Sequence, residues 1–133
     1  MGTTNFDAVA ASDFSGNITG NVTGELTGTV KLTTQAITAD GAITLKSGLV
    51  ILNKAGAIAA TLAAPTATTD DGKELNIVSI TAQAHTVTVA GGINGTGASG
   101  DVGTFGGAIG DGFTVIAYGG KWYQKTNTNV TFA

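Results

Sequence analysis

A four-residue repeat near the start of the chain limits the folds open to it more than any other feature. Residues 16–31 hold four copies of a tetrapeptide that reads glycine, polar residue, aliphatic residue, and then threonine or lysine. Because side chains along an extended strand alternate between its two faces, the glycines and aliphatic residues share one face and the polar residues share the other. Extended by one more aliphatic residue, that face consists of Gly16, Ile18, Gly20, Val22, Gly24, Leu26, Gly28, Val30 and Leu32.

The repeat predicts a shaft that assembles with copies of itself. In extended form it would be about 50 Å long. A single ribbon of this kind cannot bury its own apolar face, and the exposed face would leave an edge prone to pairing. Glycines on that face allow neighbouring shafts to approach closely. We therefore expect an extended β shaft that is stable only in an assembly of identical chains.

Composition indicates β structure and extensive contact with other protein. Charged residues make up only 11% of the chain, against about 25% in typical soluble domains, so much of the surface is expected to face protein rather than water. The chain has 21 glycines and one proline, which excludes collagen and proline-rich disorder. Frequent threonine and valine favour strands, and glycines punctuate them with turns, so the fold class predicted is all-β.

The chain divides into a lead segment (1–15), the repeat shaft (16–35) and a globular β domain (36–133). In the domain, Gly119 and Gly120 predict a two-residue hairpin turn. The pattern of short apolar runs between turn signals predicts a β-sandwich or a small barrel. The strands expected are 42–46, 49–53, 57–63, 75–80, 86–89, 102–105, 113–118, 121–125 and 129–132.

Several of these segments resemble those of bacteriophage proteins. The shaft tetrapeptides resemble the Gly-Asn-Ile/Val-Thr repeats of tailed-bacteriophage fibre and head-fibre proteins. Within the domain, residues 60–65, 70–73, 84–88 and 113–123 resemble the knob domains of phage virion proteins. The resemblance covers most of the chain after residue 15.

This resemblance implies an intertwined homotrimer that is attached to a capsid or tail through its N-terminal part. Tail fibres are generally far longer than 133 residues, so we expect a capsid decoration or head-fibre protein on the capsid surface of the virion. Its partners would be itself and the major capsid protein or another virion protein. The isolated large apolar residues of the lead segment, Phe6, Val9 and Phe14, would form the capsid anchor. The alternative function is a receptor-binding or glycan-binding adhesin module on the tail.

The residue inventory argues against most other partners. All six basic residues are lysines and the net charge is −3. The chain therefore lacks the basic clusters of nucleic-acid-binding proteins and the arginine side chains that bind phosphate in a bidentate way. Apolar runs such as residues 55–64 are too short to cross a membrane. Without cysteine there are no disulfides and no thiolate metal ligands. Residues 95–100 match G-x-G-x-x-G by letter, but no helical pattern follows them, so we expect no dinucleotide cofactor.

No catalytic or metal-binding set stands out, so we do not expect an enzyme. His85 is the only histidine; it has no evident nucleophile or orienting acid and is expected at the surface or at an interface. The aspartates at 70, 71, 101 and 111 fall in turn sequences without the spacing of a calcium loop. We therefore expect no metal site. Glycoside hydrolysis would need two carboxylates that face each other across a cleft, and the sequence neither supports nor excludes such a pair.

The aromatic residues near the end of the chain allow two interpretations. Trp122, together with Tyr118 and Tyr123, could form a platform on which a host surface glycan stacks. Alternatively, Trp122 anchors the core of the final hairpin while the two tyrosines keep their hydroxyl groups in water. The sequence favours the core interpretation and leaves the glycan platform open.

Overall fold

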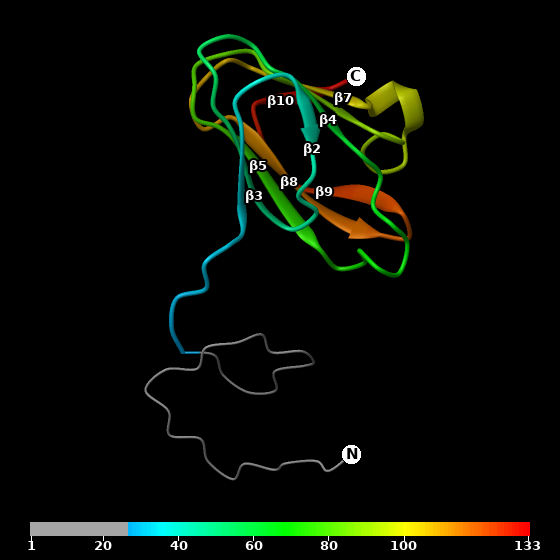
Figure 1. Ribbon diagram of the computed structural model, residues 1–133. Coiled ribbons are helices and arrows are strands. Elements are labelled where there is room, and N and C mark those ends of the chain that lie inside the picture. Colours follow the sequence, from blue (N-terminus) through cyan, green and yellow to red (C-terminus); the bar gives the residue numbers. More distant parts are fainter. Residues whose placement is uncertain (1–26) are drawn as a thin grey trace, which may run out of the picture.

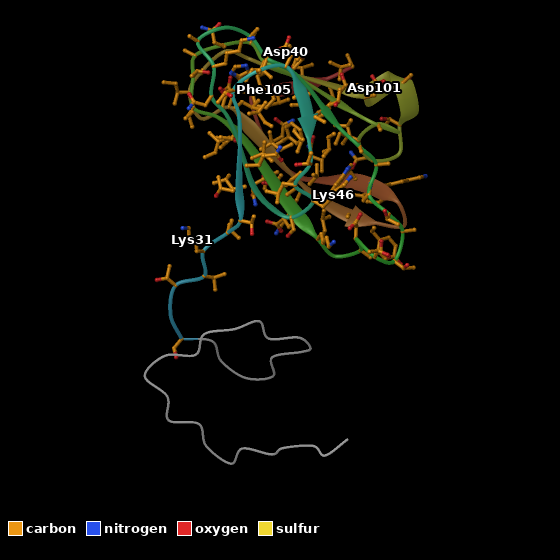
Figure 2. The ribbon with its side chains drawn as sticks, in the orientation of Figure 1. Lys31, Asp40, Lys46, Asp101 and Phe105 are labelled. Atoms are coloured by element: carbon orange, nitrogen blue, oxygen red, sulfur yellow. The ribbon has the colours of Figure 1, made fainter. Side chains whose placement is uncertain are left out.

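The computed structural model describes residues 27–133, which form an all-β domain (Figure 1). The predicted fold class is therefore confirmed for this part of the chain, whereas the anchor residues and the shaft from Gly16 to Leu26 lie outside it. The elements are β1 (Thr34–Ile37), β2 (Gly41–Ile43), β3 (Gly48–Leu52), β4 (Ala59–Leu62), β5 (Glu74–Ser79), β6 (Thr86–Val89), the short 3-10 turn η1 (Gly97–Gly100), β7 (Val102–Phe105), β8 (Gly112–Tyr118), β9 (Lys121–Thr128) and β10 (Val130–Phe132).

The strands form two mixed five-stranded sheets in a sandwich-like arrangement. Sheet A has the order β1-β3-β5-β8-β9, and sheet B has the order β10-β7-β6-β4-β2. The chain alternates between the sheets through its first six strands, so β1, β3 and β5 are parallel in sheet A, and β2, β4 and β6 are parallel in sheet B. The last four strands join these groups by antiparallel pairing. Parallel winding of this kind was not predicted from the sequence.

One hydrophobic core between the sheets holds the domain together. Strands of both sheets alternate buried and more exposed residues, as in β3 and β6, because successive side chains point to opposite faces. Each fully buried aliphatic or aromatic side chain contributes about 1.5–3 kcal/mol. The buried hydrophobic residues are Ile37, Ile43, Val50, Leu52, Ile58, Ala60, Leu62, Leu75, Ile77, Val87, Val89, Ile93, Phe105, Phe113, Val115, Ala117, Trp122 and Val130.

The predicted hairpin with a Gly-Gly turn is confirmed. Tyr118 pairs with Lys121 at the end of the β8–β9 ladder, and Gly119 and Gly120 have φ values of 56° and 76°. Two successive positive φ values are characteristic of the hairpin turns that match strand twist, and glycine adopts them without steric cost. Local sequence chemistry is therefore sufficient to specify this connection.

The first strand differs from the prediction. β1 begins at Thr34, inside the range 16–35 that was assigned to the shaft, so the last two residues of that range belong to the domain. Its short sequence Thr-Gln-Ala-Ile has little apolar alternation to mark it as a strand. Tertiary contacts hold it in place instead, because it pairs with β3 and the Gln35 Oε1 atom accepts hydrogen bonds from the amides of Thr44 and Leu45.

Sheet A has two distinct ends. We call the end where β1 begins the near end, and segment 27–33 joins the domain there (Figure 1). The β8–β9 turn lies at the same end, because β8 is antiparallel to β5. At its far end lie the loops 38–40, 53–58, 80–85 and 106–111, which we call the far loops. The far loops contain no phenylalanine, tyrosine or tryptophan.

Candidate assembly surface

The outer face of sheet A, opposite to the core, carries two uncharged rows of side chains across all five strands. In each row the residues are direct partners from one strand to the next. The first row is Ala36, Ile51, Val78, Gly112 and Thr128, and the second is Thr34, Leu49, Asn76, Thr114 and Thr126. Leu49, Ile51 and Val78 are only half-buried, so this face presents branched aliphatic side chains to the outside.

A shallow hollow of about 400 Å³ lies over these rows. Gly112 lines it and has no side chain to fill it. A β-carbon at this position would collide with the carbonyl oxygen of Ile77 on β5, so glycine is required for the close approach of the two strands. Leu32, from the segment before β1, also lines the hollow. The segment that enters the domain and the outer face of sheet A therefore share one surface, on which aliphatic side chains are mixed with threonine and asparagine.

Polar side chains on this face are hydrogen-bonded to one another. The Asn76 amide nitrogen donates to the carbonyl oxygen of Gly48 at 3.2 Å, and its Oδ1 atom accepts from the Thr114 hydroxyl at 2.8 Å. At the near end, Lys125 and Glu74 form an ion pair of 2.6 Å. Covering the face would leave the Asn76 amide and the Thr114 hydroxyl hydrogen-bonded, so the penalty for burying these two groups is small. The Lys125–Glu74 pair would instead lose hydration if it were covered.

Three of the predicted shaft residues are described by the structure. Val30 is 68% exposed and Leu32 is 49% exposed, and Gly28 is exposed as well. Segment 27–33 is not part of any strand of the domain. The described part of this chain thus leaves Val30 largely uncovered and Leu32 about half covered.

The three aromatic residues near the C-terminus do not form one surface site. Trp122 is 1% exposed, and its Nε1 atom donates a hydrogen bond of 2.9 Å to the Ala63 carbonyl oxygen. The interpretation of Trp122 as a core residue is therefore confirmed, and its inclusion in a surface platform was wrong. Tyr118 and Tyr123 are 68% and 37% exposed. They lie beside the outer-face residue Ile116, at the near end of sheet A.

His85 is buried in the core, which the sequence did not predict. Its side chain is 0% exposed, and its ring packs edge-on against Phe105 with 6.2 Å between the centroids. The Ile58 amide donates to Nδ1 at 3.0 Å, so the proton of the neutral ring is on Nε2, which lies 2.9 Å from the Thr81 hydroxyl. Alternation in residues 85–89 could have revealed this, because His85, Val87 and Val89 fall on one face.

His85 is expected to make the protein less stable in mild acid. Burial, and secondarily the positive charge of Lys54, lower the pKa of His85 below 6.5. The unfolded chain binds a proton as the pH falls through 6.5 whereas the folded protein does not, so the free energy of unfolding should fall by up to about 1.4 kcal/mol per pH unit. This fall should continue until the pH reaches the folded-state pKa. Urea unfolding between pH 7.5 and pH 5 measures the slope.

The variant His85→Asn provides the control for this prediction. Its amide oxygen can accept the Ile58 hydrogen bond but does not titrate, so the variant should be less stable yet lose the slope. The pKa values of Asp40, Asp70 and Asp111 are lowered from 3.8, so the stability that these residues contribute is present above about pH 5 and is lost as the pH falls further. An unchanged slope in His85→Asn would show that protonation of His85 is not the cause.

The aspartates act as turn residues. Lys73 and the Thr66 amide bind the Asp70 carboxylate at 2.7 Å each and together lower its pKa. The Ala108 amide donates to Asp111 at 2.8 Å and is the main cause of its lowered pKa, and Asn129 donates to both carboxylate oxygens of Asp111. Asp71 accepts from the Gly119 amide at 2.8 Å. Within residues 27–133, no group of three or more His, Asp or Glu side chains is arranged to hold a metal ion.

Comparisons with known proteins add no relative of this chain: no protein-family model matches it, and no curated protein sequence is significantly similar to it. The part of the chain that the structure describes contains no helix long and apolar enough to cross a membrane.

Proposed function

We propose that this chain is a structural virion protein: a homotrimeric capsid decoration or head-fibre protein, attached to the capsid through its N-terminal part. The observation that carries the proposal is the uncovered apolar segment before β1. Val30 and Leu32 are 68% and 49% exposed, and they continue the repeat that begins at residue 16. Large apolar side chains in an extended segment promote aggregation unless a partner covers them. Identical shafts would cover them all along the repeat.

The far end of the domain supports decoration rather than recognition. In a particle bound through the N-terminal part, the far loops would point away from the capsid. They consist mainly of glycine, alanine, threonine and other small residues, with Ile80 and Ile109 as exposed apolar side chains. Binding surfaces are typically enriched in tyrosine and tryptophan, which the far loops lack. A projecting surface of this kind suits a protein whose role is mechanical.

The second candidate is a receptor-binding or glycan-binding adhesin module on the tail. Its support is the exposure of Tyr118, at 68%, next to the half-exposed Tyr123, since tyrosine rings can stack on sugars. Both residues lie at the near end of sheet A, where the segment that leads to the shaft joins the domain. A host surface beyond the far loops would not reach them, so we rank this function second.

Two measurements test the proposed function. Light scattering of the full chain at micromolar concentration should give the mass of a trimer, and a stable folded monomer would contradict the proposal. Electron micrographs of virions labelled with an antibody against this chain should place the label around the capsid. Label confined to the tail would favour the adhesin.

A further inference from the structure

We propose that the outer face of sheet A is the surface through which the domains of neighbouring copies pack on one another. This inference rests on the proposed homotrimer and extends it from the shaft to the domain. The three domains would then form one body around the axis of the assembly, rather than three independent domains on a common stem.

The chemistry of the face supports contact with another protein surface. The ten positions of the two rows cover about 300 Å², because strands lie about 4.8 Å apart and residues about 3.3 Å apart. Half of these residues are threonine or asparagine, and the aliphatic ones lie together on β1, β3 and β5. The outer face of sheet B is the natural comparison. It presents mainly threonine hydroxyls, from Thr61, Thr86, Thr88, Thr104 and Thr131. The outer face of sheet B has one half-buried aliphatic side chain, Val102, whereas sheet A has four, Leu49, Ile51, Val78 and Ile116.

The incoming chain reaches the same face through Leu32. Even-numbered residues carry the glycine and aliphatic face of the repeat, up to Val30 and Leu32. Even-numbered residues of β1 also point outward, since Thr34 and Ala36 are exposed and pair with Leu49 and Ile51 of the outer face. Leu32 lines the hollow over that face. Because the chain bends at Gly28 and segment 27–33 forms no strand, the link between the repeat and the outer face of sheet A is Leu32 itself rather than a continuous alternation of faces.

A second copy of the chain fits the face better than a charged partner would. Neither row offers a charge for a complementary partner, and the Asn76 and Thr114 side chains are already hydrogen-bonded to neighbours in the same sheet. An area of about 300 Å² per chain is less than half of the roughly 800 Å² of a standard stable interface. Such a face is too small to hold copies together alone. The shaft would supply the missing affinity by holding the domains at high effective concentration.

The test uses the full chain and exploits its lack of cysteine. Val78→Cys places a single thiol on β5, the central strand of sheet A, and Thr88→Cys places one on β6, the central strand of sheet B. Both positions are outward and half-buried in the single chain, so they are matched. In the assembled protein, the thiol at position 78 should react with a maleimide at least about tenfold more slowly than the one at position 88, because water and reagent are excluded from interface centres.

A second pair of variants identifies what covers the face. Val78→Lys would bring like charges together near the axis, so the concentration at which the assembly dissociates should rise by about 10- to 100-fold. Thr88→Lys should leave it unchanged. Analytical ultracentrifugation over a dilution series measures both.

Three outcomes would overturn the inference. Equal thiol reaction rates in an intact trimer would show that the face is open, and the proposed function would stand. A protected thiol combined with normal assembly of Val78→Lys would show that the N-terminal segment of the same chain covers the face. A wild-type chain that is monomeric at all concentrations would overturn both the inference and the proposed function.

Discussion

Replacing Trp122 by alanine is expected to lower the free energy of unfolding by about 3–5 kcal/mol, the usual cost of truncating a buried aromatic residue to alanine. The ring is 1% exposed, so its removal leaves a cavity between the sheets. The change also leaves the Ala63 carbonyl oxygen without the hydrogen bond of 2.9 Å from Nε1, and it removes the ring that lies 5.9 Å from the Lys46 ammonium group. Denaturant unfolding followed by circular dichroism measures the loss.

The neighbouring residue provides the matched control. Tyr123 follows Trp122 on β9 but points to the outer face, where it is 37% exposed. Tyr123→Ala should therefore cost no more than about 1 kcal/mol. Similar losses for both variants would mean that Trp122 is not a core residue, and the glycan-platform interpretation would have to be reconsidered.

Deleting residues 2–32 is expected to abolish stable assembly while the domain stays folded. Among residues 27–133, every buried hydrophobic residue lies between Ile37 and Val130. The deletion also keeps Thr33, whose carbonyl oxygen accepts a hydrogen bond from the Leu49 amide. The unfolding transition should therefore remain cooperative. Without the shaft, association should weaken by about 10²- to 10⁴-fold, since the linked contacts no longer reinforce one another. Sedimentation velocity measures the change.

A shorter deletion separates assembly from attachment. Deleting residues 2–15 removes Phe6, Val9 and Phe14 but keeps the repeat. This variant should remain a trimer and fail to bind virus particles that lack the wild-type protein. Normal incorporation into particles would place the anchor in the domain instead, and it would reverse the orientation proposed for the chain.

Local patterns were sufficient to predict most strands of the domain. The ranges expected for β6 and β7 agree with the structure, and those for β3, β4, β5, β8 and β10 are right to within two residues at either end. The glycine pair at 119 and 120 specified its turn, because only positive φ values close this hairpin. The expected 42–46 strand is shorter, and the 121–125 strand is longer, because the length of a ladder depends on its partner strands.

Residues whose neighbours come from distant parts of the sequence were harder to predict. β1 was missed because its evidence is its pairing with β3 and the hydrogen bonds of Gln35. His85 was expected at the surface or at an interface, although its alternation with Val87 and Val89 indicated burial, because its polar partners, Ile58 and Thr81, meet it only in the folded core. A buried polar side chain is stable only with such partners, and its own sequence context does not reveal them.

The sequence by itself determined the all-β class, most of the strands and the glycine hairpin turn. Each of these follows from side-chain alternation or from backbone φ preferences, which act over a few residues. Only the tertiary structure decided that the first six strands wind in parallel between two sheets, that Trp122 and His85 share one core, and that Leu32 lies on the outer face of sheet A. These features depend on which strands become neighbours, and that choice is made by burying one apolar core between two sheets rather than by any local pattern.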